Sequence, residues 1–286
     1  MKRIILFRFH EHPVVCRNRL ELLIKYNLGV EIFGLFGGPE EHYNKFKKRL
    51  SRYLRNIYCI RDKTRFWKWK NGDLAVRLWY DEIGRNISFD MLHLIEWDLL
   101  LLDSLDNIYK DIPKNGVGLT ALTPIENIRE KWNWAGQVPY RKEFEDILGF
   151  VKKRFNYKLK PYGCQGPGLC LPKSFLEAYG NIEVPELCND EIRVPLFSQV
   201  LDFKIYDTGF LQNWSNNAKD EVFHCQLHPE VSFSIVDKEL ANPQGRRVFH
   251  PFRRTLILGR DGRNKYAIRP VIENLAFYRK KIFHFA

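Results

Sequence analysis

Two apolar runs flank a pair of acidic residues in the first half of the chain. Met91–Ile95 is apolar apart from one histidine. After Glu96, a tryptophan and Asp98, the apolar character resumes in Leu99–Leu102. A near-continuous apolar run is typical of a strand in a sheet that is covered on both faces. Side chains two positions apart along a strand point to the same side. The pattern therefore predicts a buried strand whose end presents two carboxylates to one point.

Strand and helix patterns alternate over the residues that precede this stretch. Lys2–Phe9 and Val30–Phe36 contain apolar runs of strand length, while Val14–Ile24 and Glu40–Asn56 place apolar residues at helical spacing. Strand, helix, strand and helix at this spacing form a βαβ pattern, which implies a parallel sheet. The amino-terminal part of the chain is therefore predicted to have an α/β fold.

Further elements are predicted around and after the acidic pair. We expect strands at Gly116–Leu122 and Asp202–Asp207, and helices that begin near Leu74, within Pro139–Tyr157, over Ser174–Tyr179 and from Asp190 to Val200. Tyr162–Pro172 is glycine-rich and then apolar, which fits either a strand or a loop. Its glycines let the backbone approach another group closely.

Charge is unevenly distributed over the 286 residues, whose net charge is +12. Residues 1–73 carry 17 basic and 7 acidic side chains, residues 240–286 carry 11 and 2, and the middle carries 18 and 25. Basic ends around an acidic middle suggest an anionic ligand held by the ends and a cation held by the middle. Nucleic acid or an anionic membrane surface would also match the basic ends.

Targeting features and cysteine pairs are not evident. No run of about 18 apolar residues is present, so no membrane span is expected. The first residues carry a short apolar run that is broken by Arg8, which does not fit a secretory signal. The six cysteines are scattered without a C-x-x-C pair, so free thiols in a reducing compartment are expected. These features predict a cytoplasmic protein.

The acidic pair suggests metal binding. Two nearby carboxylates repel one another unless a positive charge lies between them. Mg²⁺ typically takes one or two protein carboxylates together with substrate phosphates, and open α/β sheets bind ligands at the carboxyl ends of their strands. The alternative is an ordinary solvated loop. Asp103 and Asp106 compete for the same role, although their polar surroundings are more typical of a helix start.

An apolar strand, the acid-x-acid pair of Glu96 and Asp98, and a hydrophobic continuation resemble the DxD region of GT-A glycosyltransferases. These enzymes transfer a sugar from a nucleotide donor, and the DxD acids hold Mn²⁺ or Mg²⁺ on the donor pyrophosphate. The first acid here is a glutamate rather than an aspartate. The resemblance therefore implies that Asp98 is the firmer metal ligand, while Glu96 reaches the ribose or binds the metal through water.

The order of elements extends this resemblance over roughly residues 1–255. It implies one GT-A-like domain over 1–286, with a Rossmann-type mixed sheet that is mostly parallel and flanked by helices. Residues 1–103 would bind the nucleotide donor, residues 104–259 would bind the acceptor and carry the catalytic groups, and residues 260–286 would form a basic tail.

The resemblance also implies a third metal ligand and a catalytic base. A late histidine after a short turn is the third ligand in many GT-A enzymes, and His250 follows the turn NPQGRR; His224 is its rival. Inverting members carry their base in an acid pair at the start of a helix. Asp190 is the first candidate and Glu191 the second, to take a proton from the acceptor hydroxyl. Acids at a helix start also complement the helix dipole without any catalytic role.

Substrate-binding candidates come from the basic and aromatic stretches. Residues 61–80 interleave Arg and Lys with Trp, a composition that binds either one nucleotide or nucleic acid by stacking and charge, and that equally suits ordinary packing. The candidates for the donor nucleotide are Arg8, His10, Trp69, Asp73, Arg77 and Trp97. The candidates for the donor sugar or the acceptor are Trp134, Gly166, Gly168 and Arg253.

These predictions combine into a metal-dependent hexosyl- or pentosyltransferase. It would move a sugar from a nucleoside-diphosphate sugar, with UDP-sugar favoured, to a hydroxyl of a glycan or of a lipid- or protein-linked acceptor. Inversion with an aspartate base is expected, peripheral membrane contact is allowed by the basic tail, and no nucleic acid is expected as a partner.

Two rival hypotheses remain. A non-enzymatic nucleic-acid-binding protein would use residues 61–80 and the tail and bind polynucleotides in a salt-sensitive way, but it leaves the acidic pair without a role. A nucleotidyltransferase would use the same acids on a triphosphate, although no glycine-rich signature with a lysine favours it.

Overall fold

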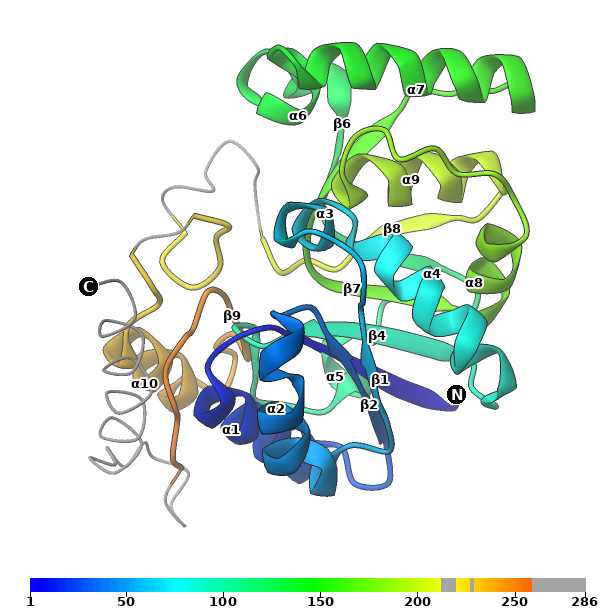
Figure 1. Cartoon of the computed structure of the whole chain (residues 1–286). Helices are drawn as coiled ribbons and strands as arrows, with labels where there is room; N and C mark the ends of the chain where they lie inside the picture. Colours follow the sequence, from blue (N-terminus) through cyan, green and yellow to red (C-terminus); the bar gives the residue numbers. More distant parts are fainter. Residues whose placement is uncertain (212–219, 227–228, 259–286) are drawn as a thin grey trace, which may run out of the picture.

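The protein folds around a seven-stranded sheet that has helices on both faces (Figure 1). We describe it from a computed structural model, in which residues 1–211, 220–226 and 229–258 are described. The strand order is β3-β2-β1-β4-β7-β6-β8. The strands are β1 (Arg3–Phe9), β2 (Glu31–Phe36), β3 (Ile57–Cys59), β4 (Met91–Glu96), β6 (Val117–Pro124), β7 (Tyr162–Pro172) and β8 (Ile205–Asp207).

β7 runs antiparallel to both of its neighbours, while the other described neighbours in this sheet run parallel. The predicted α/β class, with a mixed and mostly parallel sheet flanked by helices, is confirmed. A separate antiparallel pair consists of β5 (Leu100–Leu101) and β9 (Val248–Phe249).

The helices fill the connections between strands. They are α1 (Pro13–Tyr26), α2 (Tyr43–Leu50), α3 (Arg65–Lys70), α4 (Gly72–Glu82), α5 (Leu105–Ile108), α6 (Asn133–Gly136), α7 (Tyr140–Phe155), α8 (Lys173–Gly180), α9 (Asp190–Val200) and α10 (Phe233–Ala241). Short 3₁₀ turns are η1 (Glu40–His42), η2 (Ser51–Tyr53), η3 (Gly84–Asn86), η4 (Ile125–Asn127) and η5 (Arg129–Lys131).

The apolar core is divided into two layers by the central strands. Because side chains alternate along a strand, Ile4 and Leu6 of β1 pack in one layer with Trp79 of α4. Ile5 and Phe7 pack in the other layer, on the side of α1. This two-sided burial explains why β1 and β4 need near-continuous apolar sequences. In Figure 1, α1 and α2 cover one face, while α4, α8 and α9 cover the other.

A third, smaller apolar cluster lies beside the main sheet. It joins Leu100 and Leu102 to Phe249 and Phe252, together with Val236 of α10. The Ser232 hydroxyl caps α10 by accepting a hydrogen bond from the Ile235 N–H. This cluster fixes β9 against the segment that follows β4, and so brings the late part of the chain to the end of the central strand.

Several boundaries differ from those predicted. The helix expected over 40–56 is limited to α2 with a 3₁₀ turn at each end, and the strand expected over 202–207 is limited to β8. The pattern did not predict β3 or α10. β3 forms because Ile57–Cys59 pairs with Gly34–Phe36 of β2, a long-range contact that the local pattern does not show.

The predicted tail, residues 260–286, lies outside the described residues. Among the described residues, no helix is both long and apolar enough to cross a bilayer.

Candidate metal site and acid pair

The candidate metal ligands meet at the carboxyl end of the central strand. Arg8 at the end of β1 lies beside Glu96 at the end of β4. A tight turn follows, in which the Leu99 N–H donates to the Glu96 carbonyl, and this turn carries Asp98. Glu96, Asp98 and His250 each offer a ligand atom, and these atoms lie within 4.8 Å of one another. The structure thus brings the three predicted ligands together.

His250 reaches Asp98 because β9 pairs with β5. Leu100 lies opposite Phe249, so the residues that flank this pair also meet, and the Phe252 N–H donates to the Asp98 carbonyl. His250 Nδ1 lies 2.6 Å from the carbonyl oxygen of His224. Since a carbonyl only accepts, Nδ1 carries the hydrogen, and Nε2 faces Asp98 Oδ1 at 3.7 Å. His224, the rival candidate, contributes the backbone group that orients this ring.

Two cationic groups face the Asp98 carboxylate. Arg253 Nε lies 3.3 Å from Asp98 Oδ2, opposite the side taken by His250. Burial acts to raise the pKa of Asp98, but the charges of His250 and Arg253 outweigh it and hold that pKa well below its ordinary value. Burial acts to lower the pKa of His250, and Asp98 outweighs it in the opposite direction. The Asp98 carboxylate therefore remains ionised over the physiological range.

This donor set fits a divalent cation. Two carboxylates and one imidazole nitrogen supply two negative charges and three ligand atoms. The hydrogen bond from His250 Nδ1 to a carbonyl is the outer contact that metal-bound histidines usually make. Carboxylates suit Mg²⁺ and Mn²⁺, and an imidazole ligand is more typical of transition-metal ions than of Mg²⁺.

The predicted acid pair opens α9, close to this site. Asp190 is 7% exposed, and within the described part of the chain its carboxylate accepts no hydrogen bond; Arg8 Nη1 lies 3.9 Å from its Oδ2. Glu191 accepts hydrogen bonds on both oxygens, from the Gly166 N–H and from Asn189 Nδ2, each at 3.0 Å. Burial raises the pKa of Asp190 to about 7 and that of Glu191 to about 8.

Arg8 connects the two acidic groups. Its Nη1 lies 3.0 Å from Glu96 Oε1 and also approaches Asp190, while its Nη2 donates to the Lys68 carbonyl at 2.6 Å. Gly72, at the start of α4, leaves the room for this contact, since a Cβ there would overlap both the Asp190 carboxylate and the Arg8 guanidinium. The candidate metal site and the candidate base therefore form one continuous charged cluster.

The sequence did not reveal the buried ion pair that holds α9 in place. Arg193 donates to both carboxylate oxygens of Asp73, and its side chain has no exposed surface. It also donates to the carbonyls of Leu187 and Cys188, just before the acid pair. Burial acts to raise the pKa of Asp73, but Arg193 outweighs it and lowers that pKa. An arginine in the otherwise apolar run IRVPLF was the available signal, because a buried cation requires a partner.

Replacing Asp73 with alanine is expected to lower the free energy of unfolding by about 3–5 kcal/mol. The change leaves the Arg193 charge buried without its carboxylate, which costs more than the pair contributes. Urea denaturation followed by circular dichroism measures this loss. The matched control is Asp81→Ala, which breaks an exposed i,i+4 pair with Arg85 and is expected to change the stability far less. Equal losses for the two variants would contradict the assignment.

Several predicted nucleotide-binding residues lie away from the cluster or beneath it. The Asp73 carboxylate accepts hydrogen bonds from Arg193 and from the Tyr179 hydroxyl. Arg77 donates to the Gly180 carbonyl, on the side of α8. Trp97 is 4% exposed and lies under the rings of His10 and His12. Asp73 and Arg77 therefore do not join the acidic cluster, and the face of Trp97 is covered.

Of the predicted sugar-binding residues, likewise, one lies at the acidic cluster and another lies in the core. Gly166 of β7 joins the acid pair through Glu191, whereas a Cβ on Gly168 would overlap the ring of Phe210 in the core. Trp69 is 60% exposed, and its ring contacts that of Trp134 with centroids 5.3 Å apart.

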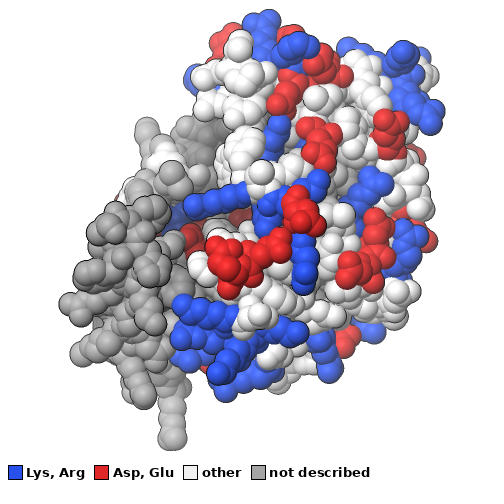
Figure 2. Space-filling view, in the orientation of Figure 1, with Lys and Arg blue, Asp and Glu red and all other residues white. Residues whose placement is uncertain are grey.

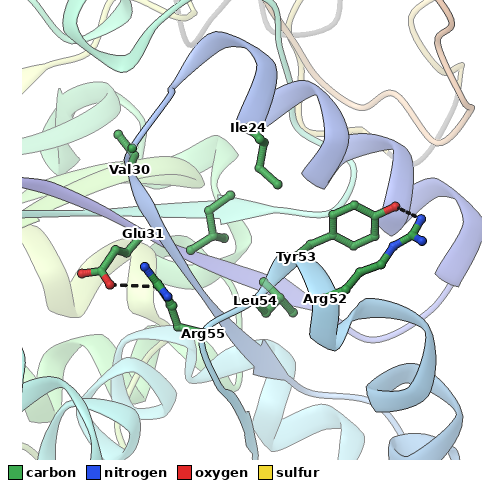
Figure 3. A pocket seen from close by; sticks show the side chains of 9 residues that line it. Ile24, Val30, Glu31, Arg52, Tyr53, Leu54 and Arg55 are labelled. Atoms are coloured by element: carbon green, nitrogen blue, oxygen red, sulfur yellow. Dashed lines mark hydrogen bonds and ion pairs between the residues drawn. The ribbon is translucent and has the colours of Figure 1, made fainter.

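Two further surface features lie apart from the cluster. Figure 2 shows lysine and arginine side chains gathered over α2, which carries Lys47, Lys48 and Arg49 in its last turn. Figure 3 shows a hollow near the start of β2, between the end of α1 and η2. Its volume is about 290 Å³. Its lining includes Ile24, Glu31, Tyr53 and Arg55. This hollow is at the amino end of β2, opposite the strand ends that carry Arg8 and Glu96.

Similarity to known proteins is limited to solved structures. No protein-family model matches the chain, and the search of curated proteins found no match. Similar solved structures include the galactosyltransferase LgtC with donor and acceptor sugar analogues, at 14% identity and a TM-score of 0.34 over 63% of this chain and 60% of that chain. The mannosyltransferase PcManGT from Pyrobaculum calidifontis, in complex with GDP-Man and Mn²⁺, matches at 11% identity and a TM-score of 0.41.

The match to PcManGT covers 72% of this chain and 54% of that one, so the chain spans less than two thirds of either transferase. A cytidylyltransferase from Leptospira borgpetersenii serovar Hardjo-bovis matches at 11% identity and a TM-score of 0.40, over 72% of this chain and 75% of that one.

Proposed function

We propose that this protein is a metal-dependent glycosyltransferase. It would transfer a sugar from a nucleoside-diphosphate sugar to a hydroxyl group of a glycan, either free or carried on a lipid or protein. The observation that supports this proposal is the meeting of Glu96, Asp98 and His250 within 4.8 Å of one another, beside a buried acid pair that Arg8 links to them. A UDP-sugar is the donor we favour.

The proposed reaction separates the roles of the two acidic groups. A divalent cation bound by Glu96, Asp98 and His250 would offset the negative charge of the leaving diphosphate. Asp190 takes the proton of the acceptor hydroxyl as that oxygen forms a bond to the anomeric carbon. The bond from the anomeric carbon to the diphosphate oxygen breaks, and the diphosphate leaves with the electron pair. The configuration at the anomeric carbon is inverted.

Asp190 is a better base than Glu191 because of its contacts. Glu191 has both oxygens engaged by donors, which fix its position and occupy the oxygens that would take the acceptor proton. The Asp190 carboxylate, by contrast, has only its approach to Arg8 within the described chain. With a pKa raised to about 7 by burial, Asp190 can accept a proton near neutral pH. Glu191 then serves to position the start of α9.

Donor binding is assigned to the residues that surround the strand ends. Arg8, His10 and Arg253 would face the nucleotide and its pyrophosphate, since guanidinium geometry suits phosphate oxygens. Asp73 and Trp97 would act from beneath, by holding α4 and the turn after β4. Gly166 and Trp134 remain the proposed contacts for sugar.

Calorimetric titration with UDP and with GDP, each with and without Mn²⁺, tests the proposal. Binding of one nucleotide that requires the metal is the expected result, and it would also name the donor class. Absence of nucleotide binding under all four conditions, together with salt-sensitive binding to DNA or RNA, would refute the proposal in favour of a nucleic-acid-binding protein. Binding of CTP or UTP with release of pyrophosphate would refute it in favour of nucleotidyl transfer.

A further inference from the structure

Four aromatic side chains from the region of α3, α6 and α7 contact one another at the surface. The ring of Trp69 lies 5.8 Å from that of Phe66 and 5.3 Å from that of Trp134, and Trp134 lies 4.4 Å from Tyr140. Phe66 and Trp69 are 52% and 60% exposed. We call these four residues the aromatic shelf. The rings are tilted to one another by 44–57°, so each keeps its own face.

α3 reverses the usual distribution of polar and apolar side chains. Lys68 and Lys70 are only 7% and 8% exposed, whereas Phe66 and Trp69 point outward. Lys70 pairs with Glu143 at 2.5 Å, and Lys68 donates to the Gly38 carbonyl. Lysines are among the residues least often buried, and they are buried only when paired. These contacts fix α3 in the orientation that exposes its aromatic residues, so the exposure is built into the fold.

The aromatic shelf begins next to the candidate base. Arg8 Nη2 donates to the Lys68 carbonyl at 2.6 Å and lies 3.5 Å from the Trp69 carbonyl oxygen. The Nη1 atom of Arg8 lies near the carboxylates of Glu96 and Asp190. One side chain therefore spans the distance between the backbone of α3 and the acidic cluster. α3, the helix that carries the ring of Trp69, therefore lies next to the acidic cluster.

We propose that the aromatic shelf binds the acceptor, and that the acceptor is a saccharide of at least two pyranose units. This inference rests on the proposed function. The unit that reacts would lie at Asp190, and a following unit would lie on Trp69 and Trp134. The C–H groups on one face of a pyranose are polarised by the ring oxygens and are attracted to the negative face of an aromatic ring. The proposed function places the donor nucleotide at the ends of β1 and β4, and we assign the shelf to the acceptor.

Saturation-transfer NMR with lactose, cellobiose and N,N′-diacetylchitobiose tests this inference directly. At least one disaccharide is expected to receive saturation from the wild-type protein. The signal should be clearly weaker in Trp69→Ala and retained in Trp69→Phe, which keeps a ring face. Leu159→Ala is the control, since Leu159 is also exposed, at 59%, and lies outside the shelf. If none of the three disaccharides binds, or if Trp69→Ala binds as the wild type does, the inference is wrong.

Kinetics separate this inference from the proposed function. With the disaccharide that binds as acceptor, Trp69→Ala is expected to raise the KM for the acceptor by up to about tenfold, the scale of one aromatic contact. The KM for the donor and the metal-dependent binding of nucleotide should stay unchanged. If the wild type binds a disaccharide at the shelf but binds no nucleotide, the proposed function is contradicted and the saccharide site is not. Binding to vesicles of phosphatidylcholine and phosphatidylglycerol that Trp69→Ala abolishes, without any saccharide binding, would assign the shelf to a membrane surface and overturn the inference.

Discussion

Replacing Asp98 with alanine is expected to abolish the metal-dependent binding of nucleotide. Asp98 is the most buried carboxylate of the candidate metal site and faces both His250 and Arg253. Its loss removes one of the two carboxylates, and with it half of the negative charge that would hold Mg²⁺ or Mn²⁺. Loss of an outer contact alone typically weakens metal binding 10–100-fold, so removal of a ligand should cost about 100-fold or more. Titration with Mn²⁺ and with nucleotide measures both effects.

The control for this prediction is Asp103→Ala. The sequence pattern left Asp103 as a competitor for the metal, but the structure places its carboxylate at the start of α5, where it accepts hydrogen bonds from the Ser104 N–H and Asn107 Nδ2. This variant should bind nucleotide and metal as the wild type does. Asp98→Asn keeps the shape of the side chain and guards against a variant that fails to fold. Wild-type metal dependence in folded Asp98→Asn and Asp98→Ala would refute the assignment.

Replacing Asp190 with asparagine is expected to lower the rate of sugar transfer by about 10²–10⁴-fold, the usual contribution of a general base. Binding of the donor nucleotide should remain, because Asp190 is not among the three candidate metal ligands. Single-turnover transfer at saturating donor measures the rate, and calorimetry measures the binding. If Glu191→Gln loses the rate while Asp190→Asn keeps it, the base is Glu191 instead.

The pH dependence of the rate provides a second readout for Asp190. Only the ionised carboxylate can accept a proton, so the transfer rate should rise with pH as Asp190 loses its own. Burial raises the pKa of Asp190 to about 7. A cation at the metal site favours the ionised form and moves the midpoint of the rise below that value. The rise should disappear in Asp190→Asn. A rise that persists unchanged in this variant would show that another group is the base.

Local sequence patterns determined the central elements of this protein. The apolar runs around Glu96 and Asp98 require burial on both faces of a sheet, which predicts β4 and the position of the acids at its end. The acid pair at Asp190 followed by an apolar run predicts the start of α9. Both inferences succeed because they depend on periodicity and on burial within one element, and neighbouring residues are sufficient to fix these.

Only the tertiary structure decided which distant side chains meet. Arg253 faces Asp98 from 155 positions along the chain, and His250 arrives with it because β9 pairs with β5. The sequence suggested that Asp73 binds nucleotide, but in the structure its carboxylate pairs with Arg193, which lies 120 positions away along the chain. The exposed rings of α3 likewise depend on the pairing of Lys70 with Glu143, a residue of α7. The sequence gives the charge and size of each side chain. The packing of whole helices and strands determines which residue lies close enough to neutralise a buried charge.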